Sequence, residues 1–167
     1  IGEKGVDVLL RAAGQAPDVP LVIVGDGPDR AKLEHQAQVA GLRNVRFVGA
    51  KWGADLNDWL RNCRFVVVPS LWHENFPYVI LQAFAAGKPV VGSNRGGIPE
   101  LVAHGELGAV YEATDASMLA ATIRNIAAMP DDEVQQMGEK AKRLVMDGFN
   151  DDVFYTRLME IYEGVLA

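Results

Sequence analysis

The chain has 167 residues, of which 49% are hydrophobic and 23% are charged, and its formal net charge is -6. This size and balance are typical of a globular domain that buries its own core, and they exclude a disordered or fibrous chain. Lysine and arginine are scattered, so there is no basic stripe for DNA or RNA, whereas a phosphate ligand, which needs only one or two local cations and backbone amides, is not excluded.

The first part of the chain alternates predicted helices and strands. An amphipathic helix at 6–13 ends near Gly14, and an all-apolar strand at 21–24 runs into a glycine-rich turn. The pattern then continues with a helix at 29–40, a strand at 45–48, a helix at 56–61, a strand at 65–68, a helix at 77–86 and a strand at 89–92. Continuous apolar strands separated by helices predict an α/β fold, a doubly wound parallel sheet covered on both faces.

The last third is predicted to be helical. A short apolar segment at 108–111 precedes helices at 115–128, with Asp115 as the N-cap, at 131–146 and at 151–166. Apolar residues recur at helical spacing in the final helix, namely Phe154, Leu158, Ile161, Tyr162 and Val165. The pattern predicts first that they pack against the core; if they are exposed instead, they would mark a docking surface for the missing half. No repeat or long linker divides the chain, so we expect one domain over residues 1–167.

Parallel α/β sheets bind ligands beyond the carboxyl ends of their strands, where loops meet helix N-termini. The loops predicted at that edge are residues 2–5, 25–28, 49–53, 70–76 and 93–100. The loop at 70–76 is the least easily explained by folding alone, because it gathers polar and aromatic side chains just before a helix that Pro77 opens. Two interpretations stay open: the amides around Pro77 receive a ligand oxygen, or Glu74 or Asn75 simply caps the helix.

The remaining loops hold weaker candidates. Gly25 and Gly27 follow a strand as a phosphate loop does, but a simple turn explains them equally well. The same holds for Gly96 and Gly97, which allow a backbone to approach closely. Lys4, at the entry to the first helix, is either a point charge for a diphosphate or a solvated lysine. No partner at triad or metal spacing is found for the three histidines, His35, His73 and His104.

The sequence also bears on the cellular location of the protein and on whether the chain is a fragment. The single cysteine, Cys63, rules out an internal disulfide, and no spaced cysteine and histidine set indicates zinc, so we expect no metal and a reducing, cytoplasmic location. The apolar runs are strand-sized, well below the roughly 20 residues of a membrane span, and no signal peptide is seen. The sequence has no initiating Met, and Ile1 is followed at once by Gly2 and a turn, so we expect a fragment of a longer protein.

Residues 69–100, PSLWHENFPYVILQAFAAGKPVVGSNRGGIPE, resemble the donor-binding signature of the retaining glycosyltransferases of group 1, or family 4, which include glycogen synthases and sucrose synthases. The segments EKGVDVLLRA, LVIVGDGP, NVRFVGA and IYEGVLA are similar to further parts of that family in the same order. The resemblance implies the Rossmann-like C-terminal half of the two-domain GT-B architecture. It also implies that the acceptor binds to an N-terminal domain missing from this chain, and that the isolated half is inactive.

The resemblance assigns roles to individual residues. Glu74 matches the catalytic glutamate that binds the hydroxyls of the donor sugar. Eight residues later, Gln82 stands where the family has a second glutamate on the ribose, so we expect weaker ribose binding. An arginine that usually accompanies Lys4 on the diphosphate would lie upstream of Ile1. The residues implied to bind the donor are Lys4, Gly25, Gly27, Val48, Asn75, Phe76, Pro77, Tyr78, Gln82 and Gly97.

The function implied by the resemblance is binding of a UDP-, GDP- or ADP-sugar by a retaining glycosyltransferase that transfers a hexose to a glycan, lipid or small molecule. No cofactor or metal is expected, because cations and amides can stabilise the leaving diphosphate. Any peripheral membrane association is expected through the missing half only. Two alternatives remain, a GT-B-type sugar-nucleotide epimerase domain and a non-catalytic flavodoxin-like binding domain.

Overall fold

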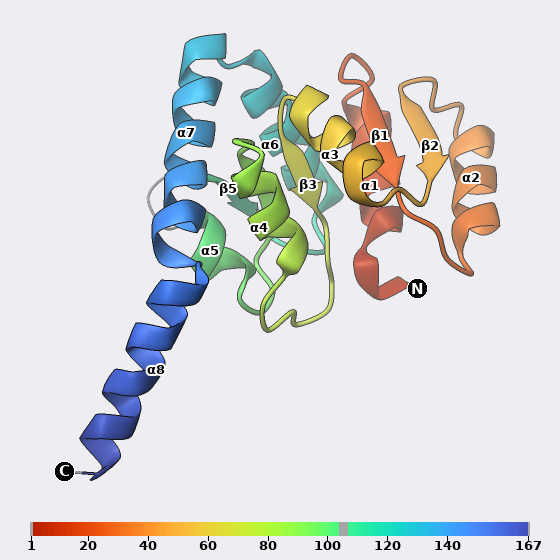
Figure 1. The fold of residues 1–167 in the computed structure, drawn as a ribbon. Helices are drawn as coiled ribbons and strands as arrows, with labels where there is room; N and C mark the ends of the chain where they lie inside the picture. The colour runs from red at the N-terminus through yellow and green to blue at the C-terminus, as the bar shows by residue number, and fades with distance from the viewer. Residues whose placement is uncertain (1, 104–106, 167) are drawn as a thin grey trace.

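The computed structural model describes residues 2–103 and 107–166. Figure 1 shows an α/β body and one helix that projects from it. The strands are β1 (Leu21–Val24), β2 (Val45–Gly49), β3 (Val66–Val68), β4 (Val90–Ser93) and β5 (Gly108–Tyr111). The helices are the 3-10 turn η1 (Gly2–Lys4), α1 (Val6–Gln15), α2 (Arg30–Val39), α3 (Gly53–Asn62), α4 (Tyr78–Ala85), α5 (Ile98–Ala103), α6 (Ala116–Ala128), α7 (Asp131–Gly148) and α8 (Asp151–Leu166).

The strands pair only in parallel, as predicted. They form a two-stranded sheet, β1-β2, and a three-stranded sheet in the order β3-β4-β5. The segment at 108–111, expected only as an apolar stretch, is a strand because it pairs along its whole length with β4. The two sheets are separate because, in the described parts of the chain, no backbone hydrogen bond joins β1 to β3.

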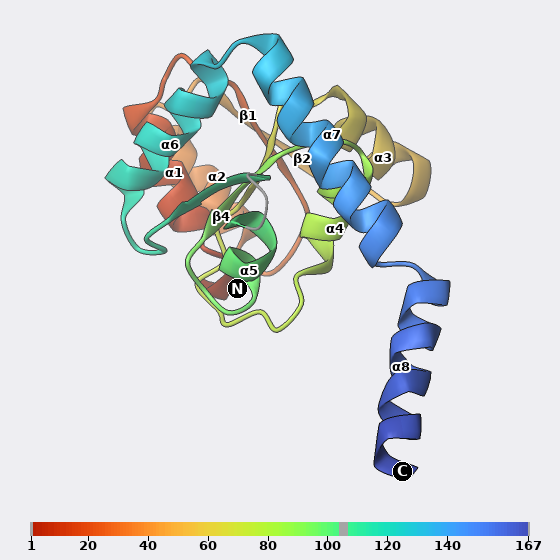
Figure 2. The same cartoon turned by 90° about the vertical axis from the view of Figure 1, so that its left-hand side faces the viewer.

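Helices cover both faces of the three-stranded sheet, which explains why its strands are apolar throughout. Adjacent residues of a strand point to opposite faces. Val91 packs into a core shared with α1 and α6, whereas Val90 packs into a second core shared with α4 and α5. Figure 2 shows α1 and α6 on one side of the molecule and α4 and α7 on the other. The doubly wound α/β prediction is therefore confirmed.

Helix α8 departs from the prediction for the C-terminal segment. Figures 1 and 2 show α8 projecting from the end of α7, away from the rest of the molecule. Most of the apolar side chains named above are exposed, by 68% for Phe154, 62% for Ile161 and 79% for Val165, so the prediction that they pack against the core is wrong for them, while Leu158 is partly buried. The cause is the direction in which α8 leaves the turn at Phe149 and Asn150. None of the helices within the described ranges is long and apolar enough to cross a membrane.

Tyr111, at the end of β5, places a polar hydroxyl group in the apolar core. Its side chain is 1% exposed, and its hydroxyl has no hydrogen-bond partner among the described residues. Burial, with a smaller contribution from Asp7, raises the pKa of Tyr111 above its usual range. A buried polar group without a partner costs about 1–3 kcal/mol.

We expect Tyr111→Phe to leave the free energy of unfolding unchanged or to raise it by about 1 kcal/mol, because the change removes only the unpaired hydroxyl. Urea unfolding followed by circular dichroism measures this difference. The control is Tyr162→Phe on α8, an exposed position where no effect is expected. A loss of stability on Tyr111→Phe would show that the hydroxyl has a partner in solution.

Candidate functional site

The candidate site is organised around the side chain of Glu74, in the loop between β3 and α4. The ammonium group of Lys4 donates a hydrogen bond to Oε1 of Glu74. Ser70 Oγ donates to the same oxygen at 3.2 Å. The side chain of Glu74 is 23% exposed and that of Lys4 is 63% exposed, so the pair is open to a ligand from one side. The structure thus brings together two residues that the sequence places far apart.

Backbone hydrogen bonds explain how Lys4 reaches this loop. The amides of Leu71 and Trp72 both donate to the carbonyl oxygen of Glu3, at 2.7 and 3.2 Å. Gly5 makes this approach possible, because a Cβ atom at its position would lie 1.9 Å from the carbonyl oxygen of Pro69. The turn η1 is therefore fastened to the carboxyl end of β3.

Two buried serines support the same edge of the sheet, and sequence reasoning did not single them out. Ser70 is 2% exposed and Ser93 is 0% exposed. Ser93 Oγ donates to the carbonyl oxygen of Ser70 at 2.6 Å, which joins the ends of β3 and β4. The available signal was a serine at the end of each of two apolar strands. Ser70 is the more informative of the two, because it also contacts Glu74.

The start of α4 excludes one of the two interpretations of the loop at 70–76, the helix cap. The helix begins at Tyr78, its N-cap is Pro77, and no side chain caps it. Glu74 is engaged by Lys4 and Ser70 instead, so the capping interpretation is wrong. Within the described residues, the backbone amides of Asn75, Phe76 and Tyr78 have no hydrogen-bond acceptor. Free amides at a helix N-terminus favour an anionic ligand.

Gly96 and Gly97 bring a second loop against the first. The amide of Gly97 donates to the carbonyl oxygen of Glu74 at 2.8 Å. A Cβ atom would lie 2.3 Å from the carbonyl oxygen of Glu74 at position 96, and 2.6 Å from that of Asn75 at position 97. The two glycines therefore allow the loop at 93–100 to lie against the backbone of the loop at 70–76.

A separate cluster, which we call the base-side cluster, contains Gly25, Gly27 and Val48, three of the residues that the resemblance implies to bind the donor. The amide of Gly25 donates to the carbonyl oxygen of Gly49 at 2.9 Å, which brings the turn containing Gly27 beside the end of β2, where Val48 lies. Arg30 reinforces this contact. Its Nη1 lies 3.4 Å from Oδ2 of Asp26 and 3.0 Å from the position that a Cβ of Gly49 would take.

Arg30 was not predicted from the sequence. Its guanidinium also donates to Oε1 of Glu34 at 2.8 Å, a bond within α2, while its contact with Asp26 joins α2 to the turn at 25–28. The acidic partners raise the pKa of Arg30 above its ordinary value, and the hydrogen bond that Arg30 donates to Glu34 is the largest cause. No hydrogen bond or ion pair among the described residues connects this base-side cluster to the pair Lys4 and Glu74.

The remaining candidates lie at the margins of the site. Gln82 is partly buried in α4, one turn beyond Tyr78. Arg95 pairs with Oε1 of Glu112 at 3.4 Å, and so is occupied by a neighbouring carboxylate. His35 and His73 are exposed, and His104 lies outside the described residues. The described ranges contain no group of three or more His, Cys, Asp or Glu side chains able to hold a metal ion.

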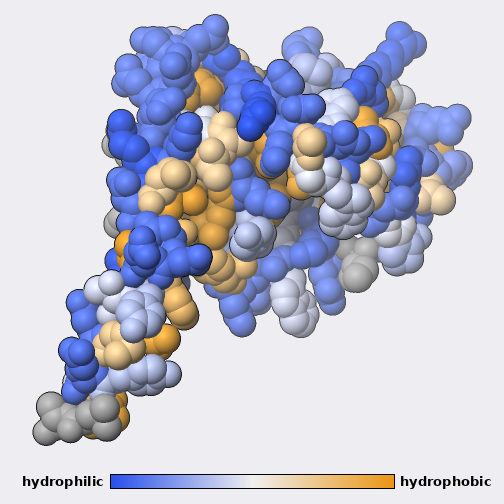
Figure 3. Space-filling model, in the orientation of Figure 1, coloured by the Kyte–Doolittle hydropathy of each residue, from blue (hydrophilic) through white to orange (hydrophobic). Residues whose placement is uncertain are grey.

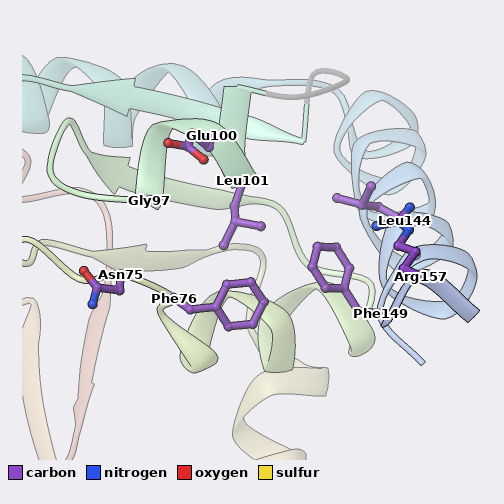
Figure 4. A pocket seen from close by; sticks show the side chains of 9 residues that line it. Asn75, Phe76, Gly97, Glu100, Leu101, Leu144, Phe149 and Arg157 are labelled. Atoms are coloured by element: carbon purple, nitrogen blue, oxygen red, sulfur yellow. The ribbon is translucent and has the colours of Figure 1, made fainter. Parts of the chain in front are cut away.

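A cavity of about 340 Å³ adjoins the loop at Asn75 and Phe76. Apolar residues line much of it, and Figure 3 shows hydrophobic residues gathered between α4, α5 and α7. Figure 4 shows the rings of Phe76 and Phe149 and the side chain of Leu101 pointing into it. Glu74 and Lys4 are not among its lining residues. The cavity therefore lies beside the charged pair and is continuous with its loop.

Comparisons with known proteins concern nearly the whole chain. Residues 1–144 match the family described as glycosyl transferases group 1. The chain is 36% identical over 141 residues to the D-rhamnosyltransferase WbpZ of Pseudomonas aeruginosa, an alignment that covers 83% of this chain and 36% of that protein.

Solved structures show the same resemblance. Sucrose-phosphate synthase from Thermosynechococcus elongatus superposes with a TM-score of 0.86 at 28% identity, over 99% of this chain and 43% of that one. Alr3699/HepE of Anabaena, solved in complex with UDP-glucose, superposes with a TM-score of 0.84 at 29% identity, over 98% of this chain and 46% of that one. The chain spans about a third of the length of the curated relatives that it matches.

Proposed function

This chain belongs to the group 1 glycosyltransferases, and we propose that it forms the nucleotide-sugar-binding part of a retaining enzyme that transfers a hexose to a glycan, lipid or small-molecule acceptor. The observation that carries the proposal is the contact between Lys4 and Glu74 beside the free amides of Asn75, Phe76 and Tyr78. One cation and several amide donors suit a diphosphate, and an adjacent carboxylate suits sugar hydroxyls.

The proposed mechanism assigns the leaving diphosphate to Lys4 and the free amides. Charge accumulates on the diphosphate as the bond to the sugar breaks, so fixed donors at this place stabilise the transition state more than the bound substrate. Lys4, released from Glu74, then pairs with phosphate oxygens. Glu74 accepts hydrogen bonds from the sugar hydroxyls and orients the ring. No metal ion is required in this scheme.

The rest of the nucleotide is assigned to the other residues around the sheet edge. Gln82 contacts the ribose through its side-chain amide, which gives a weaker bond than a carboxylate would. Val48 borders the base. Gly25, Gly27 and Gly97 wall the site, and Pro77 shapes the loop at 70–76. The Anabaena structure with UDP-glucose supports a nucleotide sugar as the ligand, with UDP, GDP and ADP as the candidate carriers.

The acceptor is assigned to another part of the protein. The alignments cover only about a third of the length of the curated relatives, and the proposed residues account for a donor only. The chain alone is therefore expected to bind the nucleotide sugar without transferring it, in the cytoplasm, with any membrane contact made elsewhere in the protein. The family match favours this function over an epimerase or a flavodoxin-like binding domain.

Titration of the purified 167-residue chain with UDP, GDP and ADP tests the proposal. We expect at least one of them to bind with a Kd in or below the millimolar range, measured by calorimetry. Lys4→Ala is expected to weaken binding about 10-fold, because a charge-assisted contact to phosphate is lost. Lys32→Ala, which removes the same charge from an exposed position of α2, is the matched control. Absence of binding at millimolar concentrations of all three nucleotides would contradict the proposed function.

A further inference from the structure

Phe149 lies at the junction between α7 and α8 and contacts the loop that precedes α4. Its ring centroid is 5.7 Å from that of Phe76, with an angle of 41° between the ring planes. Its amide donates to the carbonyl oxygen of Val145, which ends α7 and holds the residue in place. The contact thus connects a helix junction to the loop that carries the free amides.

The backbone of this loop is poorly restrained just where the ring contact occurs. Glu74 is held through its side chain and through the bond from the Gly97 amide to its carbonyl oxygen. The next described backbone hydrogen bond is from Ile80 to Pro77. Between these two anchors, Asn75 and Phe76 make no backbone hydrogen bond in the described part of the chain. Packing contacts therefore hold this stretch, namely the backbone of Gly97 against the carbonyl group of Asn75 and the ring of Phe149 against that of Phe76.

We propose that Phe149 is a positioning residue for donor binding: it packs against Phe76 and thereby holds the amides of Asn75 and Phe76 where a diphosphate meets them. The inference rests on the proposed function of this loop. It extends the site to a residue at the α7–α8 junction that touches no part of the nucleotide. Figure 4 shows Phe76 and Phe149 on opposite sides of the same cavity, their rings turned toward one another.

The inference predicts an effect confined to the diphosphate. The base-side cluster around Gly25, Gly49 and Arg30 has no described hydrogen bond or ion pair to this loop. Loss of the ring contact should therefore weaken binding of a nucleoside diphosphate and spare that of its monophosphate. An aromatic pair of this kind corresponds to about a 2- to 10-fold change in affinity.

The experiment compares the 167-residue chain and its variants in titrations with UDP, GDP and ADP and with UMP, GMP and AMP. Phe149→Ala is expected to lower the affinity ratio of diphosphate to monophosphate about 2- to 10-fold. Phe149→Tyr, which keeps the ring, should restore the wild-type ratio. Phe154→Ala, the same truncation at a 68% exposed position of α8, is the matched control and should leave the ratio unchanged. Thermal unfolding verifies that each variant is folded.

The outcomes separate the inference from the function on which it rests. If the wild-type chain binds a diphosphate but Phe149→Ala weakens diphosphate and monophosphate equally, or neither, the positioning role is overturned and the proposed function stands. If the wild-type chain binds none of the six nucleotides, both fail together. Should Phe149→Ala not fold, Phe149→Leu, which keeps most of the apolar volume without the ring, takes its place and must lower the same ratio.

Discussion

Replacing Glu74 by alanine is expected to slow sugar transfer by the whole protein about 100- to 10,000-fold. Each charge-assisted hydrogen bond that we propose between Glu74 and the donor sugar contributes about 1.5–3 kcal/mol, and the loss of two of them from the transition state gives this range. The free energy of unfolding is expected to change little. The ion pair with Lys4 is exposed on one side, and such pairs contribute about 0–1 kcal/mol to stability. We therefore expect the unfolding midpoint to stay within about 3 °C of the wild-type value.

The measurement pairs steady-state kinetics with thermal unfolding of the same preparations. Glu74→Gln should give an intermediate rate, since the amide keeps the shape and one acceptor but not the charge. Glu139→Ala, on the exposed side of α7, is the control for removing a carboxylate away from the site. If Glu74→Ala lowered stability in proportion to activity, Glu74 would be a structural residue and its assignment to the donor sugar would be wrong.

Gly96→Ala is expected to have the second large effect, through the backbone alone. A Cβ atom at this position would lie 2.3 Å from the carbonyl oxygen of Glu74, far inside van der Waals contact, and the residue has a φ of 53°. The loop carrying Glu74 must therefore move. We expect nucleoside diphosphate affinity to fall at least about 10-fold and the free energy of unfolding to fall by about 2–4 kcal/mol.

Gly53→Ala provides a control matched in backbone conformation. Gly53 has a φ of 52°, and a Cβ atom there would meet nothing within 4 Å. Its alanine variant should lose only the cost of a left-handed residue, about 1–2 kcal/mol, and should bind nucleotide normally. Calorimetric titration and urea unfolding measure both quantities for both variants. Equal losses in the two would mean that the contact between the loops contributes nothing beyond conformational strain.

Local patterns were sufficient to predict most helices and strands. The strand Leu21–Val24 and the helix Asp151–Leu166 have the bounds expected from the sequence, and Asp115 caps α6 as predicted, accepting from the amides of Ser117 and Met118. These features depend on interactions within a few residues of the chain. Apolar periodicity and capping chemistry are local, so they can be read without knowing the fold.

Long-range contacts explain what was missed. The exposure of Phe154 on α8 depends on the direction in which that helix leaves α7, and helical periodicity carries no information about direction. The bond from Ser93 to Ser70 depends on β3 and β4 being neighbours, which an isolated serine does not reveal. Arg30 likewise lies close to Gly49 only because β1 and β2 pair, and nothing local to Arg30 reveals that pairing.

Glu74 illustrates the division between the two kinds of information. By itself the sequence determined the α/β class, the family resemblance and the loop in which a carboxylate stands before a helix. It left open whether Glu74 caps that helix or faces a ligand. Only the tertiary structure excluded the cap, by bringing Lys4 and Ser70 to its side chain and by leaving the start of α4 without a side-chain cap, whereas contact with a ligand is our proposal. The physical reason is that a cap is a local contact, whereas an ion pair between distant segments exists only once the sheet has placed both at one edge.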